Sequence, residues 1–179
     1  NSASLVFNRS NSMTVGNSIS GSGSVTKTGS GTLILTASNT YAAGTTINAG
    51  TLSANNTTDS ATGSGAIVVN GGGTLAGAGA VSGAVTINSG GTLAPGASVE
   101  SLAVGALTFN TGATFHVELD SDASLTAAAD LVNANGNLGI FAGAILALAD
   151  LGNTILADGT KFTLISYAGT WNGGIFLDK

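Results

Sequence analysis

The sequence contains 179 residues, of which 43% are apolar and only 7% are charged, and its formal net charge is −5. Ordinary soluble domains carry about 25% charged residues, so this surface must consist largely of Ser, Thr, Asn, Gly and Ala. The four basic residues are scattered, which excludes a nucleic-acid footprint. The absence of cysteine excludes disulfides and thiolate metal sites, and no apolar run approaches the roughly 20 residues that membrane insertion requires.

The first predicted element is a coil over residues 1–19, built from two short strands. Its apolar residues alternate with polar ones, as expected for strands with one buried face. The alternating pairs are Leu5 with Phe7 and Met13 with Val15. A second coil begins at Val25, and Lys27 shares its parity. We therefore expect the aliphatic stem of Lys27 to line the coil while its ammonium group reaches solvent at a corner.

A Gly-Thr-Leu motif then recurs at steps of 19, 23 and 18 residues, starting at Gly31, Gly50, Gly73 and Gly91. Around each copy the parity persists: Leu33 and Leu35 should face one way, and Thr32 and Ile34 the other. The intervening segments are rich in Gly, Asn, Ser and Thr, which suit tight corners. Self-similarity at this step indicates a solenoid in which each coil stacks on the previous one.

The clearest copy of the repeat, residues 20–56, carries three motifs in a fixed order. They are Lys27-Thr28-Gly29-Ser30-Gly31-Thr32-Leu33, Asn39-Thr40-Tyr41 and Gly44-Thr45-Thr46. In this it resembles the passenger-associated β-strand repeat of bacterial autotransporters. The resemblance implies a right-handed parallel β-helix that is secreted or displayed on the bacterial surface. The sequence departs from the family at Ala43, where glycine is usual, and at Ile34, which should place one apolar side chain outside.

Downstream the resemblance is looser. Gly91 to Ser98 resembles a corner of such proteins and contains the only proline, Pro95, where a missing ladder donor does least harm. Gly112 to Leu119 resembles a further strand, and Asp130 to Val132 and Lys161 to Ile165 resemble the last coils of the family. Residues 131–179 are expected to form weaker coils that cap the end or dock. The alanine-rich stretch from Ser124 to Ala129 is expected to be either a short helix or an excursion from a corner.

His116 and the acidic residues near it are the candidates for chemistry. Alternation places His116 and Glu118 together on the outer face. A histidine and a carboxylate in this arrangement are a candidate for weak metal binding, but a plain solvated face is the preferred interpretation. Glu118, Asp120, Asp122 and Asp130 form the only acidic concentration. A glycosidase would need two such carboxylates across a groove with aromatic platforms, and no aromatic residue lies between Phe115 and Phe141. The Asp120-Ser121-Asp122 turn is a further, calcium-binding alternative.

The glycine-rich segments are not phosphate loops. Three of them invite that interpretation: residues 21–23, 71–73 and 77–79. None is followed by Gly-Lys-Ser/Thr or by a helix, so we interpret them as corners. No arrangement of Ser, His and Asp resembles a hydrolase, and the sequence predicts neither a catalytic site, a cofactor nor a metal site.

The sequence therefore predicts a single all-β domain over 1–179, a right-handed parallel β-helix of roughly eight coils. Neither end shows a cap: Leu5 and Phe7 begin one end, and Ile175 to Leu177 finish the other. The aromatic residues Tyr167, Trp171 and Phe176 suggest a partial cap or a docking surface. We expect an extracellular or cell-surface structural solenoid without catalytic activity. It either pairs with other copies through its terminal coils to form a filament or is a rod segment of a larger passenger-type protein. The alternatives are an adhesin stalk that contacts host or neighbouring cells and, least favoured, a polysaccharide-acting enzyme.

Overall fold

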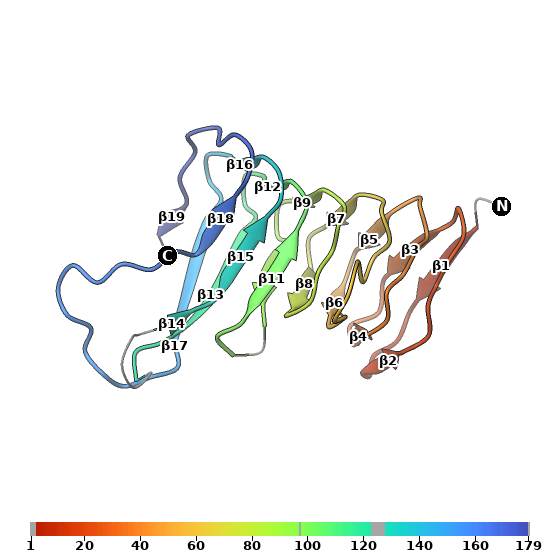
Figure 1. Ribbon diagram of the computed structural model, residues 1–179, viewed down its shortest axis with the longest axis horizontal. Helices are drawn as coiled ribbons and strands as arrows, with labels where there is room; N and C mark the ends of the chain where they lie inside the picture. Colours follow the sequence, from red (N-terminus) through yellow and green to blue (C-terminus); the bar gives the residue numbers. More distant parts are fainter. Residues whose placement is uncertain (1–2, 97, 123–127, 179) are drawn as a thin grey trace.

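A computed structural model describes residues 3–96, 98–122 and 128–178, and within these ranges every regular element is a β-strand (Figure 1). The strands form three sheets. Sheet A contains β1 (Ser4–Phe7), β3 (Ser24–Lys27), β5 (Thr45–Ile47), β7 (Ile67–Val69), β9 (Val85–Ile87), β12 (Leu107–Phe109) and β16 (Leu138–Ile140). Sheet B contains β2 (Met13–Val15), β4 (Thr32–Leu35), β6 (Gly50–Ala54), β8 (Gly73–Gly77), β10 (Thr92–Pro95), β13 (Thr114–Asp120), β17 (Ile145–Asp150) and β19 (Leu177–Asp178). Sheet C contains β11 (Ser101–Val104), β15 (Leu131–Ala134) and β18 (Ile165–Tyr167).

The strands of these three sheets pair in parallel with the strands one coil away, which makes the chain a parallel β-solenoid. The eight strands of sheet B listed above follow one another along the rod, so the chain makes eight coils, the last of them partial. The predicted all-β solenoid of roughly eight coils is confirmed. Figure 1 shows the coils stacked from the amino-terminal end at the right to the last coils at the left.

The predicted alternation is also confirmed. In sheet B, Leu33, Leu52 and Leu75 occupy one register position, and all three are buried. The preceding position holds Thr32, Thr51, Thr74, Thr92 and Thr114, which form an outward column of five threonines. Ile34 lies partly exposed on the outer face, as expected from its parity. Stacked aliphatic rows of this kind remove apolar surface from water at about 25 cal/mol per Å², which is the main source of stability in such a rod.

The cross-section changes along the rod. The first four coils contribute strands only to sheets A and B, and their third side consists of loops such as 55–66. Sheet C begins with β11 in the fifth coil. Pro95 is the last residue of β10, and the pairing of β10 with β13 stops two residues earlier, at Leu93 with Phe115. The proline therefore stands at a strand end, as predicted.

Part of the alanine-rich stretch can be assigned. Residues 123–127 lie outside the described ranges, whereas Ala128 and Ala129 form β14, which runs antiparallel to β13. These two residues are therefore part of an excursion that returns beside the strand it left, and they are not helical.

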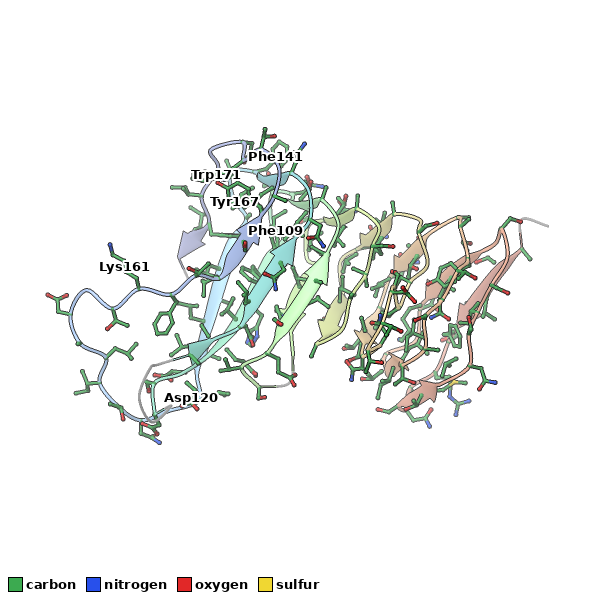
Figure 2. The ribbon with its side chains drawn as sticks, in the orientation of Figure 1. Phe109, Asp120, Phe141, Lys161, Tyr167 and Trp171 are labelled. Carbon is green, nitrogen blue, oxygen red and sulfur yellow. The ribbon has the colours of Figure 1, made fainter. Side chains whose placement is uncertain are left out.

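The cores of the last two coils are incompletely covered. Phe176 reaches into the core and contacts Phe109 edge to face, with ring centroids 5.0 Å apart. Tyr167 and Trp171 remain half exposed, and both lie near Phe141 at the same end of the rod (Figure 2). The segment 151–164 leaves the rod between β17 and β18 and extends beyond the last coil (Figure 1).

Candidate functional site

His116 and Glu118 lie on the outer side of β13, as predicted, because Phe115, Val117 and Leu119 take the buried positions. Their register partners in β17 are Ala147 and Ala149. The outer face at this point therefore carries no second set of ligands from the neighbouring strand. Glu118 is only partly exposed, and its Oε2 atom is buried with no hydrogen-bond partner among the described residues.

Asp130, which the sequence groups with the other acidic residues, is not part of an exposed acidic face. Its side chain is fully buried. One carboxylate oxygen accepts a hydrogen bond from the backbone N–H of Glu100 at 3.0 Å, and the other accepts one from Glu118 at 2.8 Å. Burial raises the pKa of Asp130 because it penalises the ionised form, although the two N–H donors and His116 act in the opposite direction. Asp130 therefore joins the start of β11 to β13 as a structural acceptor.

The other acidic residues are engaged in local turns. Asp120 accepts the backbone N–H of Asp122 at 2.9 Å, and Asp122 accepts the hydroxyl of Thr154. That hydroxyl is the main reason why the pKa of Asp122 is lowered. Asp150, which the sequence analysis did not single out, accepts the N–H groups of Ser121 and Gly152 at 3.1 and 3.0 Å. These carboxylates close the corner at which segment 151–164 begins.

No metal centre emerges from these residues. Within the described ranges, no group of three or more His, Asp or Glu side chains is placed to hold an ion. The glycine-rich segments are corners, as expected: Gly21, Gly72 and Gly77 all have positive φ, at 115°, 84° and 110°.

The ammonium group of Lys27 was expected to reach solvent at a corner, and this prediction is wrong. The side chain is 1% exposed, and Nζ donates to the carbonyl oxygen of Gly29 and, at 3.1 Å, to that of Ala49 in the next coil. Burial lowers the pKa of Lys27. A Cβ on Gly50 would lie 2.7 Å from Nζ and 2.4 Å from the carbonyl oxygen of Gly29. Glycine at position 50, with φ of 64°, is therefore what leaves room for the ammonium group.

The second and third motifs of the repeat also supply internal hydrogen bonds. The Asn39 side chain accepts the N–H of Ile19 at 2.7 Å and donates to the carbonyl of Ala61 at 2.6 Å, so it links the coils on either side. The hydroxyls of Tyr41 and Thr45 are 2.7 Å apart, and both residues are buried. Burial raises the pKa of Tyr41 to about 12. The polar residues of the repeat thus satisfy buried backbone and hydroxyl groups.

A family comparison agrees with this arrangement. Residues 25–54 match the model described as the passenger-associated-transport-repeat. This segment is therefore similar to that repeat. It contains Lys27, Asn39 and Tyr41 together with Gly50, and their contacts explain the motif: each polar group satisfies a partner in its own or an adjacent coil. No curated protein matches the chain. The described residues contain no helix long and apolar enough to cross a membrane.

A hollow with a volume of about 520 Å³ lies at the amino-terminal end of the rod. Its walls come from the start of β1, the corner at 19–24 and Tyr41. Leu5 and Ile19 provide apolar surface there, and no carboxylate or basic side chain lines it. This hollow is suited to an apolar group and offers no acid or base for catalysis.

Proposed function

We propose that this chain is an extracellular or cell-surface structural solenoid without catalytic activity, a rod segment of a passenger-type protein. The observation that carries the proposal is the inward direction of the passenger-associated-transport-repeat's polar groups. Lys27, Asn39 and Tyr41 are all buried and hydrogen-bonded within the coils. The polar residues that define the repeat therefore stabilise the stacking of the coils, and stacked coils form an elongated rod.

The proposed lack of catalytic activity is supported by the hydrogen bonds that engage the acidic residues. Asp130 is buried on two backbone N–H groups, and Asp122 and Asp150 hold loop backbone or hydroxyl groups. A glycosidase needs one carboxylic acid and one carboxylate free to face a sugar across a cleft. The purified chain should leave a panel of polysaccharides intact. Hydrolysis by the wild-type chain that E118Q or D120N abolishes would overturn the proposal.

The location is tested on cells of the source organism. Antibodies raised against the folded chain should label intact cells or detect the chain in the culture medium. Labelling only after permeabilisation would contradict a surface or secreted location. Negative-stain electron microscopy of the purified chain should show elongated particles.

End-to-end assembly into a filament is the finer form of the proposal, and it is supported by apolar exposure at both ends. Leu5, Val6 and Met13 are 45%, 55% and 37% exposed in the first coil, whereas Leu148 and Leu177 are 50% and 56% exposed in the last two. Terminal strands of a solenoid also carry unpaired backbone groups. A contact of this head-to-tail type does not close on itself and generates a filament.

An adhesive stalk is the alternative that the outer threonine column of sheet B favours, because it offers a flat row of hydroxyl groups along the side of the rod. Adhesion should be lost on substituting Thr51 and Thr74, whereas assembly should be lost only on changing the ends. Cell-binding assays on the two sets of variants separate these functions.

A further inference from the structure

The sequence contains three asparagine–glycine pairs, and their side chains have different surroundings in the fold. The pairs begin at Asn70, Asn135 and Asn172. In such a pair the backbone nitrogen of the glycine can attack the side-chain amide of the asparagine, because glycine has no Cβ to obstruct the approach. In all three pairs the glycine N–H has no acceptor among the described residues, so the asparagine side chain decides which pair can react.

Two of these side chains are held by hydrogen bonds at both ends of the amide. Nδ2 of Asn70 donates to Oδ1 of Asn48 at 2.7 Å, and Oδ1 of Asn70 accepts a hydrogen bond from Asn88 at 2.8 Å. Oδ1 of Asn172 accepts the N–H of Ile140 at 3.0 Å, and Nδ2 donates to the carbonyl oxygen of the same residue at 3.0 Å. These bonds must break before either amide can turn towards the backbone nitrogen that follows it.

The amide of Asn135 is not held in this way. Asn135 is the first residue after β15, at the corner that leads from sheet C to β16 (Figure 1). Its side chain is exposed and forms no hydrogen bond with the rest of the described chain. Asn172 is also exposed, so exposure alone does not distinguish the two residues. The difference between them is the pair of hydrogen bonds that Asn172 makes to Ile140.

We propose that Asn135 is a site of spontaneous covalent modification, deamidation through a succinimide ring. The backbone nitrogen of Gly136 forms a bond to Cγ of Asn135, and the bond between Cγ and Nδ2 breaks. The amide nitrogen leaves as ammonia and takes the proton of the Gly136 N–H. Water is the only other reactant, and it opens the ring to aspartate or isoaspartate without any oxidant or reductant.

The isoaspartate product lengthens the main chain by one carbon atom at a corner that is paired on both sides. The N–H of Asn135 donates to the carbonyl oxygen of Val104 in the preceding coil at 2.9 Å, and the carbonyl of Gly136 accepts the N–H of Gly169 in the following coil at 3.0 Å. A Cβ on Gly136 would already lie 3.0 Å from the backbone of Ala106. An extra backbone atom therefore disturbs the register of the corner with both neighbouring coils, and the product also carries one more negative charge.

The test is to age the folded wild-type chain at mildly alkaline pH in water labelled with heavy oxygen, which marks every ring opened during the incubation. Digestion with pepsin at acid pH and mass spectrometry then locate the product. It should appear at Asn135, and the reaction at Asn70 and Asn172 should be slower by at least about tenfold, because their hydrogen bonds must break first. In concentrated urea the three pairs should react at similar rates. Equal rates at the three sites in the folded chain, or a folded chain that does not react at Asn135, would overturn the proposal.

Variants test whether the hydrogen bonds are the cause. N135Q keeps an amide at the same exposed position but would have to close a larger ring, so the product at this site should disappear. The double variant N48A/N88A removes both partners of Asn70 and should bring its rate close to that of Asn135. Circular dichroism shows whether the double variant is folded, and the wild-type comparison decides the proposal if it is not. A folded double variant in which Asn70 remains unreactive would contradict the protective role of these bonds.

The structural consequence is measured on the aged chain itself. Anion exchange separates the deamidated form by its added negative charge, and electron-transfer fragmentation distinguishes isoaspartate from aspartate. N135D is the matched control, because it carries the same charge on an unaltered main chain. The isoaspartate form should unfold at a lower urea concentration than N135D. Equal midpoints would show that the corner accommodates the extra atom, and this would refute the proposed disturbance of register.

Discussion

The Nζ atom of Lys27 donates a hydrogen bond to the carbonyl oxygen of Ala49, 3.1 Å away and one coil further along the rod. It also donates to the carbonyl of Gly29 in its own coil, and only 1% of the side chain is exposed. A charged group is therefore used inside the solenoid to connect two successive corners.

Replacing Lys27 with methionine should destabilise the fold although it retains a similar apolar stem. The substitution leaves the carbonyls of Gly29 and Ala49 without this donor, and an unsatisfied buried polar group costs about 1–3 kcal/mol. Urea denaturation followed by circular dichroism measures the change. T26V on the adjacent outer position is the control and should be within about 0.5 kcal/mol of wild type. Equal stability of K27M and wild type would show that the ammonium group contributes nothing net.

Alanine at Gly50 should be much more costly than alanine at Gly72. Both glycines have positive φ, at 64° and 84°, so each substitution carries a similar backbone penalty of about 1–2 kcal/mol. Only at Gly50 would the new Cβ overlap backbone, 2.4 Å from the Gly29 carbonyl oxygen, whereas at Gly72 the nearest atom is 3.8 Å away. The difference in unfolding free energy between G50A and G72A isolates the steric clash. Comparable stability of the two variants would be inconsistent with this packing.

The asparagine ladder should respond differently at its middle and at its end. Asn70, Asn88 and Asn110 follow the strands of sheet A in three successive coils, and each donates to the asparagine of the coil before it at 2.7–2.8 Å. N88A removes two of these bonds and N110A removes one. At about 1 kcal/mol per bond, N88A should be destabilised roughly twice as much in thermal or urea unfolding. A larger effect of N110A would argue against the ladder as the source of stability.

Asp130 and Asp122 should make opposite contributions to the pH dependence of stability. The pKa of Asp130 is raised above 3.8 in the fold, so the folded state binds more protons and the unfolding free energy falls as pH rises through the window above 3.8. The pKa of Asp122 is lowered, so its contribution is present above 3.8 and is lost as pH falls through the lowered value. The stability of wild type relative to D130N should therefore decrease with rising pH, and relative to D122N it should increase. The measurement is urea unfolding between pH 2 and pH 7, and the same sign for both would refute the assignment.

Much of this architecture could be predicted because a strand has only two faces. Leu33 and Leu35 share one parity, and Thr32 and Ile34 share the other. Because the Gly-Thr-Leu motif recurs, the same alternation of inward and outward residues is repeated from coil to coil. Alternation does not predict how deeply the end group of a long polar side chain is buried. Lys27 was placed on the correct face but expected to reach solvent, because the Ala49 carbonyl that holds it lies 22 residues further along the chain.

The acidic residues show the same limit. Glu118 lies outside as its parity requires, but Asp130 is buried because β14 brings the chain back against β13, and the partners of its carboxylate are backbone groups at Glu100 and Glu118. The sequence analysis did not predict sheet C, because its strands become a sheet only through pairing with strands about 30 residues away in the next coil.

The sequence alone thus determined the coil step, the face on which each strand residue lies and the resemblance of residues 25–54 to a passenger-associated-transport-repeat, since these follow from local periodicity and motif. Only the tertiary structure decided which backbone groups meet Lys27 and Asp130. Those relations depend on the register between strands that lie about 20 to 30 residues apart, and register is set by the packing of all coils together.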